Sequence, residues 1–210
     1  MFLKSLTNKI WGVLSTTLIV ASCYFTNSPP EIYAASVIGI LFVLCVANGK
    51  AIGNLLGAAL ALMYAYLSYK SGFFGNSVIN LYFIFPMQLL AFFVWRKYKG
   101  ALSLPKGAGW LMAGLFIVAS FISVKLAINS GSSLPLHDGI SSILLIFATV
   151  LLTLKVKEQW YAWIPYNAIE VLMWFAAASL HPEMLAIFVM RSVFFINSLI
   201  GFYNWRKNLV

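Results

Sequence analysis

The segment Glu158-Gln-Trp-Tyr-Ala-Trp-Ile-Pro-Tyr-Asn-Ala-Ile-Glu-Val-Leu-Met-Trp174 opens a long apolar stretch of this chain, yet it carries polar and aromatic groups that a lipid-facing helix lacks. Positions 160, 163, 167, 170 and 174 recur at helical spacing, so two tryptophans, an amide, a carboxylate and a third tryptophan share one face. An ionisable group at the centre of a bilayer costs about 2.5–3.5 kcal/mol, so it persists with a partner or a function. The stripe therefore predicts a membrane helix that carries a binding site for a flat, polar, cationic ligand.

The composition of the chain is that of a polytopic membrane protein. Of 210 residues, 62% are hydrophobic and 9% are charged, and the mean hydropathy is +0.91. We expect an all-α fold with no extramembrane domain. Cys23 and Cys45 fall within apolar segments, which favours inert core residues. No disulfide, metal site or cofactor is predicted.

Turn residues separate eight hydrophobic segments, each close to the length that crosses about 30 Å as a helix. The segments cover residues 11–25, 33–48, 52–69, 77–95, 110–128, 138–154, 160–178 and 182–205. The first segment is short and would also fit a peripheral helix. No small-residue cleavage site follows it, so we interpret it as a retained helix and not a signal peptide.

The net charge of +9 comes from basic residues at the ends of these segments and not from one soluble face, which argues against a nucleic-acid partner. If the N-terminus is inside, eleven of the fourteen basic residues are cytoplasmic: Lys4, Lys9, Lys50, Arg96, Lys97, Lys99, Lys106, Lys155, Lys157, Arg206 and Lys207. Lys70 and Lys125 fall outside, and Arg191 lies within the last span. The positive-inside rule therefore predicts that both termini are cytoplasmic.

The ends of two spans indicate an internal repeat, because residues 95–97 and 205–207 both read Trp-Arg-Lys. Superposing them brings Met87-Gln88 onto Asn197-Ser198 and Gly57 onto Asn167. We predict an N-terminal helix (1–30), a first three-helix bundle (31–97), a cytoplasmic loop with a linker helix (98–136) and a second three-helix bundle (137–210). Such parallel repeats place their site at the repeat interface. The alternative is that Trp-Arg-Lys is only a common cytoplasmic helix end.

The motif Glu158-x-Trp160-x-x-Trp163-x-x-x-Asn167 resembles the PnuC family of bacterial vitamin-precursor transporters. Other matching positions, in the same order and spacing, are Asn54, Gly57, Tyr64, Pro86, Met87, Gln88, Trp95, Asp138, Gly201 and Trp205. The resemblance runs from about residue 31 to the end of the chain. The chain departs from the family pattern at Leu145, Thr149 and Glu170, and all three positions lie where a ligand could be touched.

The resemblance implies a fold of two three-helix bundles joined by a linker helix, similar to full-length SWEET sugar transporters. It also implies a homotrimer within the bacterial inner membrane. It implies facilitated diffusion of a small vitamin through one central site, and trapping of the substrate by a separate cytoplasmic kinase. Family substrates are nicotinamide riboside, thiamine and riboflavin. Glu170 favours the first two, which are cationic, over neutral riboflavin.

Ten residues are candidates for substrate contact. Helix rise places Asn167 and Gln88 at the same depth, about 10 Å from the cytoplasmic face, on opposite repeats. The full set is Gln88, Trp160, Trp163, Asn167, Glu170, Asn54, Tyr64, Tyr82, Thr149 and Asn197. The alternative for Gln88 and Asn167 is that their buried amides hydrogen-bond one helix to another and do not contact substrate. Trp160 would also fit an anchor at the membrane–water interface. For Trp95, Trp174 and Trp205, such an anchor is the better interpretation.

Glu170 has three possible roles that the sequence does not separate. Helix rise places Arg191, on the next span, about one turn from the level of Glu170, so the two could form a structural ion pair. Glu170 could instead be the counter-ion of a cationic substrate. It could also be protonated, because burial raises the pKa of a carboxyl group.

The first functional hypothesis is a facilitator of nicotinamide riboside uptake, and the alternative within the same family is a thiamine transporter. A non-transporting membrane scaffold is the alternative from another class, but it leaves Gln88, Trp163, Asn167 and Glu170 unexplained as a set. An enzyme is not predicted, because the spacing suggests neither a nucleophile–base pair nor a metal-ligand cluster.

The predicted orientation can be tested by cysteine labelling of intact cells. An impermeant reagent should label single cysteines placed in the 70–76 and 129–136 loops and spare those in the 97–106 loop, because basic loops stay inside. Labelling of the 97–106 loop would contradict the predicted orientation.

Overall fold

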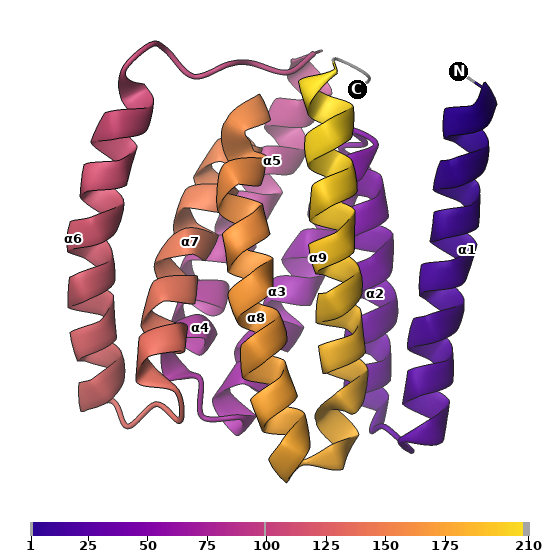
Figure 1. Ribbon diagram of the computed structural model, residues 1–210, viewed down its shortest axis with the longest axis vertical. Helices are drawn as coiled ribbons and strands as arrows, with labels where there is room; N and C mark the ends of the chain where they lie inside the picture. Colours follow the sequence, from indigo (N-terminus) through magenta and orange to yellow (C-terminus); the bar gives the residue numbers. More distant parts are fainter. Residues whose placement is uncertain (1, 99, 208–210) are drawn as a thin grey trace.

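The computed structural model describes the backbone of residues 2–98 and 100–207, with side chains from residue 10 onward. Lys99 and the side chains of Lys4 and Lys9 lie outside the described residues. Eight long helical rods lie side by side in the described chain (Figure 1). Their helices are α1 (Phe2–Phe25), α2 (Pro30–Ala47), α3 (Ile52–Lys70), α4 (Phe74–Ile79) continued by α5 (Phe85–Lys97), α6 (Ala108–Asn129), α7 (Pro135–Thr153), α8 (Trp160–Leu180) and α9 (Leu185–Arg206). The predicted all-helical architecture is confirmed.

Prolines decide where several helices begin and bend. Pro30 and Pro135 each occupy the first position of a helix, where the missing N–H costs nothing. Pro86 stands inside the fourth rod, where its ring would collide with the carbonyl four residues earlier. A π-helical turn, Asn80–Ile84, precedes it, and the Phe85 N–H donates to the Asn80 carbonyl five residues back. The wider turn accommodates the proline without breaking the rod.

Six of the rods form a closed ring, in the order α2, α3, α5, α7, α8, α9, and each packs against the next. The first three and the last three are consecutive in the chain, and they meet where α5 packs on α7 and where α9 packs on α2. Helices α1 and α6 stand outside the ring, at opposite edges of the molecule (Figure 1). The ring places its centre at the interface between two three-helix units, which is where the sequence predicts a site.

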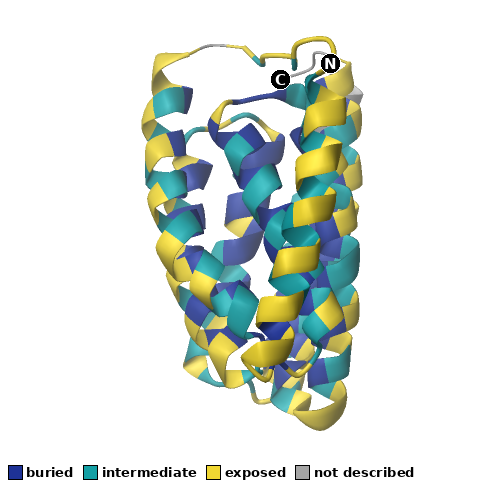
Figure 2. Cartoon of the chain, turned by 90° about the vertical axis from the view of Figure 1, so that its left-hand side faces the viewer, coloured by how far each residue is buried: buried dark blue, intermediate teal, exposed yellow. Residues whose placement is uncertain are grey.

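Six helical segments are long and apolar enough to cross a membrane, within the described residues: α2, α3, α4–α5, α6, α7 and Pro182–Arg206. Helix α8 has the length but carries the polar stripe, and the described apolar part of α1, Ile10–Phe25, is shorter. Exposed residues dominate the side of the bundle covered by α6 (Figure 2). Only Ala127 of that helix is buried. An outer surface this apolar identifies an integral membrane protein.

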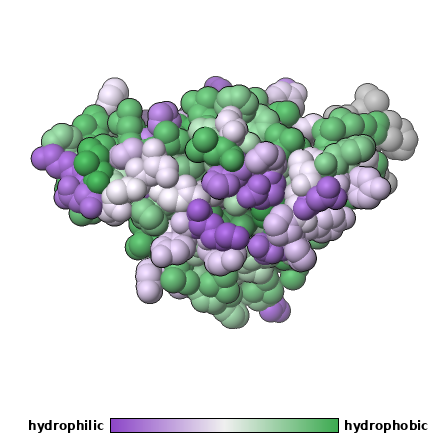
Figure 3. Space-filling view, turned by 90° about the horizontal axis from the view of Figure 1, so that it is seen from below, coloured by the Kyte–Doolittle hydropathy of each residue, from purple (hydrophilic) through white to green (hydrophobic). Residues whose placement is uncertain are grey.

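Helix α1 begins and α9 ends at the same end of the bundle, which we name the N/C end (Figure 1). The opposite end, named the loop end, is seen in Figure 3, where hydrophilic side chains gather near the centre. The Asp138 carboxylate there accepts hydrogen bonds from the backbone N–H groups of Gly75 and Asn76 (both 2.9 Å), the Asn76 amide (2.8 Å) and the Ser132 hydroxyl (2.9 Å). This cluster joins α4 of the first unit to α7 of the second.

The N/C end is joined by a different set of contacts. Leu102, in the loop before α6, pairs with Val156 as an isolated parallel β-bridge, with 2.9 Å hydrogen bonds to the backbone of residues 155 and 157. The Leu104 N–H donates to the Glu158 carboxylate at 3.1 Å. The Trp95 indole N–H donates to the Leu152 carbonyl at 2.8 Å. The loop from the first unit is therefore fixed to the turn between α7 and α8.

Lys155 lies beside this junction. Its amine donates to the Tyr98 carbonyl at 3.2 Å and stands 5.3 Å from the centre of the Trp95 ring. Burial lowers the pKa of the Lys155 amine, because the charged form loses hydration.

The loop-end cluster can be tested by Asp138→Asn. The new amide places N–H donors where the carboxylate accepts hydrogen bonds, so the free energy of unfolding should fall by about 1–3 kcal/mol. Thermal melting of the purified protein in detergent measures the change. Glu31→Gln is the matched control, because Glu31 and Lys70 form an exposed pair at 3.7 Å whose loss should cost little. Equal melting temperatures for the two variants would contradict this role of Asp138.

Candidate transport site

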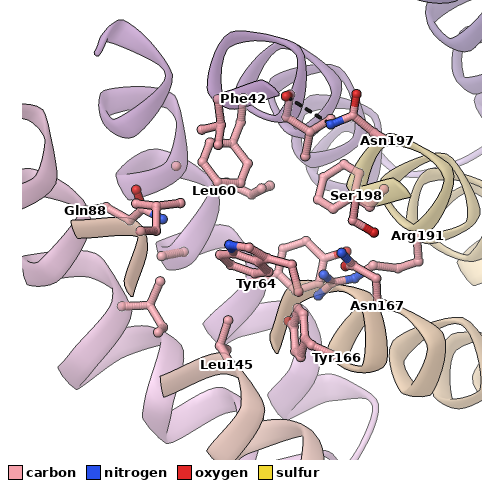
Figure 4. A pocket seen from close by; sticks show the side chains of 18 of the residues that line it. Phe42, Leu60, Tyr64, Gln88, Leu145, Tyr166, Asn167, Arg191, Asn197 and Ser198 are labelled. Atoms are coloured by element: carbon pink, nitrogen blue, oxygen red, sulfur yellow. Dashed lines mark hydrogen bonds between the residues drawn. The ribbon is translucent and has the colours of Figure 1, made fainter. Parts of the chain in front are cut away.

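A cavity lies at the centre of the ring, with a volume of about 60 Å³. All six ring helices contribute to its wall. The cavity brings together six of the ten residues that the sequence predicted: Tyr64, Gln88, Trp160, Trp163, Asn167 and Asn197. Figure 4 shows Gln88 entering from one side, and Asn167 and Arg191 from the other. The two three-helix units therefore share one site.

Amide side chains supply hydrogen-bonding groups on both sides of the cavity. Gln88 of α5 is 1% exposed, and its Oε1 has no hydrogen-bond partner among the described residues. Asn167 of α8 is buried, and its Oδ1 likewise has no partner in the described chain. Asn197 differs, because its amide donates to the Val43 carbonyl of α2 at 3.1 Å. Gln88 and Asn167 thus remain free to bind a ligand, whereas Asn197 ties the second unit to the first.

Aromatic rings form another part of the wall. Trp160 and Trp163 lie one turn apart on α8, and both are buried. The Trp163 indole N–H donates to Gln159 Oε1 at 3.3 Å, and its ring meets Tyr166 edge-on at 5.5 Å. Gln159 therefore fixes the orientation of the Trp163 ring. A ring held in this way can stack on a flat heteroaromatic group.

A buried ion pair stands at one boundary of the cavity. Arg191 Nη2 of α9 lies 2.8 Å from Glu170 Oε2 of α8, and the Trp174 indole N–H donates to the same oxygen at 3.0 Å. The guanidinium lies 4.0 Å from the centre of the Tyr64 ring of α3. Arg191 lines the cavity and Glu170 does not. Of the three roles left open for Glu170, the described geometry is that of the structural ion pair.

Four predicted residues lie away from the cavity. Glu170 lies behind Arg191, and Asn54 and Thr149 are fully buried among the helices. Tyr82 was predicted to contact substrate, but its side chain is 74% exposed on the outside of the bundle. The π-helical turn that accommodates Pro86 includes Tyr82, and hydrophobicity alone did not reveal which face of this turn points outward.

The prediction that three tryptophans act as interfacial anchors is wrong. Trp174 is fully buried and hydrogen-bonds Glu170. Trp95 and Trp205 are buried against each other, with ring centres 5.7 Å apart. Each lies near the end of an apolar span, which suggests a membrane surface, but packing between the two units buries all three rings.

Several wall residues gave little or no signal in the sequence. Arg191 was considered only as a partner of Glu170, although it reaches the cavity itself. Asn80 and Ser198 could have been found as polar residues within apolar spans. Phe42 and Phe194 also line the cavity, but nothing in an apolar segment distinguishes a wall phenylalanine from a core one. Among the described residues, no group of three or more His, Cys, Asp and Glu could hold a metal ion.

The cavity suits a flat, polar molecule better than a purely apolar one, because tryptophan rings and unpartnered amide oxygens face the same space. Its volume has room for about four to six waters, at roughly 10–15 Å³ each. A flat heteroaromatic ligand would be larger than this, so side chains or whole helices would have to move for one to bind.

Comparison with known proteins gives consistent matches over this architecture. The family model described as "Nicotinamide mononucleotide transporter" matches residues 31–207. A nicotinamide riboside transporter PnuC of Neisseria mucosa is 31% identical over 185 residues, which cover 82% of this chain and 70% of the relative. Another of that name, from Haemophilus influenzae, is 29% identical over 210 residues, 94% of this chain and 88% of the relative. A crystal structure of the vitamin B3 transporter PnuC superposes with a TM-score of 0.86 at 27% identity, covering 97% of this chain and 92% of the other.

The role of Glu170 can be tested with two variants. Glu170→Gln leaves the Arg191 charge buried without its counter-ion, which should cost about 3 kcal/mol or more of stability. Replacing both residues, in Glu170→Gln/Arg191→Met, should recover much of the loss, as measured by thermal melting in detergent. Glu183→Gln is the control, because Glu183 pairs with His181 on an exposed surface. A stable Glu170→Gln protein with weakened ligand binding would instead indicate a substrate counter-ion.

Proposed function

The chain belongs to the nicotinamide mononucleotide transporter family, and from this membership we propose that it carries nicotinamide riboside across a bacterial cytoplasmic membrane. The resemblance to the PnuC family that the sequence predicted is confirmed by the family model, by both curated relatives and by the solved structure. The observation that supports this substrate most directly is the central cavity, whose amides and tryptophans come from both three-helix units.

The chemistry of the wall fits the parts of nicotinamide riboside. The pyridinium ring would stack on Trp163, because a cation is attracted to the face of an indole ring. Its carboxamide would hydrogen-bond the unpartnered oxygens of Gln88 and Asn167. The ribose hydroxyls would face Arg191, since a guanidinium donates hydrogen bonds and repels the positive end of the ligand. Glu170 is already paired with Arg191 and gives no preference for one cationic vitamin over another.

The arrangement of helices supports a SWEET-like transporter with eight crossings. The two units, within 31–97 and 137–210, would be parallel repeats about an axis along the membrane normal, with α6 as the linker within 98–136 and α1 as an added N-terminal helix. Residues 110 positions apart meet in pairs near this axis. Trp95 contacts Trp205, and Tyr64 contacts Trp174, each with ring centres 5.7 Å apart. Such pairs are expected where equivalent residues approach a two-fold axis.

Transport would proceed by facilitated diffusion, with the loop end and the N/C end opening in turn around the central site. The N/C end would face the cytoplasm, as the distribution of basic residues predicts. A separate cytoplasmic kinase would trap the substrate by phosphorylation, and the transporter itself would catalyse no reaction. The exposed apolar face of α6 would lie against lipid or against the neighbouring subunit of a homotrimer.

A calorimetric binding panel tests the proposed substrate. Purified protein should bind nicotinamide riboside more tightly than thiamine or riboflavin. Tighter binding of thiamine would assign the chain to the second candidate, and no binding of any of the three would refute the proposal.

The stacking role is tested by comparing Trp163→Ala with Trp205→Ala. Loss of one stacking face should weaken the binding of nicotinamide riboside by about 1–2 kcal/mol, roughly tenfold or somewhat more in Kd. Trp205 is also a buried tryptophan but does not line the cavity, so its removal should affect melting temperature more than affinity. Equal losses of affinity in the two variants, at equal expression, would rule out Trp163 as the stacking residue.

A further inference from the structure

Gly57, in the first half of α3, lines the central cavity. It is buried in a helix that crosses the whole bundle, where glycine is less stable than alanine. Its backbone is ordinary helix, so no left-handed conformation requires glycine at this position. The reason for glycine must therefore be sought in what stands next to it.

A side chain at position 57 would meet two wall residues. A Cβ atom built there lies 2.8 Å from Cδ and Oε1 of Gln88, and 2.8 Å from Cε2 of Phe42. These distances are shorter than van der Waals contact, so a methyl group would displace the glutamine amide or the phenylalanine ring. The Gln88 amide thus occupies the space that an alanine side chain would fill.

The other glycine on this side of α3 meets a different environment. A Cβ at Gly53 would collide with Cβ of Cys45, with the Val46 nitrogen and with the Phe42 carbonyl. These are mainly backbone atoms of α2, so Gly53 permits close packing of two helices. Gly53 does not line the cavity, whereas Gly57 does. The two glycines therefore differ in that Gly57 stands against a cavity-lining side chain, Gln88, and Gly53 stands against α2.

Gly57 also stands at the position equivalent to Asn167 in the second unit, 110 residues later. Asn167 presents its own amide to the cavity from α8, whereas at Gly57 the amide comes from the adjacent helix α5 through Gln88. Both amides have an oxygen without a partner among the described residues. Because residue 57 has no side chain, the amide on that side of the cavity comes from α5 and not from α3, so the two units contribute their amides from non-equivalent helices.

We propose that Gly57 is a positioning residue for substrate recognition, because its missing side chain allows the Gln88 amide to stand against α3 and face the ligand across from Asn167. This inference deepens the proposed function and rests on it for the identity of the ligand. A larger residue at 57 would displace the amide from this position and drive it further into the cavity.

The experiment compares Gly57→Ala, Gln88→Asn and their combination, with Gly53→Ala as the matched control. Gly57→Ala should raise the Kd for nicotinamide riboside about tenfold or more, measured by calorimetry, because overpacking moves the amide. Asparagine at 88 is one methylene shorter and leaves room for the alanine. The combined variant should therefore bind more tightly than Gly57→Ala alone. Gly53→Ala should keep the parent affinity, even if its melting temperature falls.

The melting temperatures give a second readout that needs no ligand. The loss caused by Gly57→Ala should shrink in the Gln88→Asn background, whereas the loss caused by Gly53→Ala should not. If Gly57→Ala alone does not fold, recovery of folding in the combined variant supports the inference, and failure to recover overturns it. Parent affinity in Gly57→Ala, or rescue by Phe42→Leu and not by Gln88→Asn, would also overturn it. If the parent does not bind nicotinamide riboside, the proposed function fails, and the melting temperatures still decide whether the missing side chain at position 57 makes room for the Gln88 amide.

Discussion

The buried ion pair between Glu170 and Arg191 is the interaction on which the central part of this bundle depends. Neither charge could remain in an apolar interior alone, so each requires the other. Their 2.8 Å contact joins α8 to α9, and the stacking of Arg191 on Tyr64 extends the same cluster to α3 of the first unit. Trp174 completes it through a hydrogen bond to the carboxylate. The cavity lies directly beside this cluster, so the residues that stabilise the core also limit the space for a ligand.

The two ends of the bundle are closed by different chemistry. At the loop end, the side chain of Asp138 accepts hydrogen bonds from donors of the opposite unit. At the N/C end, a backbone bridge at Leu102 and the packing of Trp95 against Trp205 join the units. Hydrogen bonds to a carboxylate are individually strong, whereas aromatic contacts are weaker and spread over more atoms. A transporter that opens its ends in turn would have to break these two sets of contacts separately.

The proposed internal repeat would explain why the site lies where it does, and its imperfections would explain what the site can recognise. Two three-helix units meet across a ring and leave a space between them. Identical units would line that space with identical groups. Here asparagine at 167 is matched by glycine at 57, and glutamine at 88 by serine at 198, so amides face the cavity from different helices of the two units. An unsymmetrical ligand needs such an unsymmetrical wall.

The sequence by itself determined the all-helical class, the positions of the eight rods and the α8 stripe that contains Trp163 and Asn167, because hydrophobic periodicity and turn residues act locally. Helix rise also placed Gln88 at the level of Asn167, since depth depends only on distance along a helix. Only the tertiary structure decided that Glu170 pairs with Arg191 and does not line the cavity, and that Tyr82 points outward. It also decided that Trp95, Trp174 and Trp205 are buried. These outcomes depend on which helix faces of the two units meet. The sequence of a single apolar segment does not show which other helices pack against it.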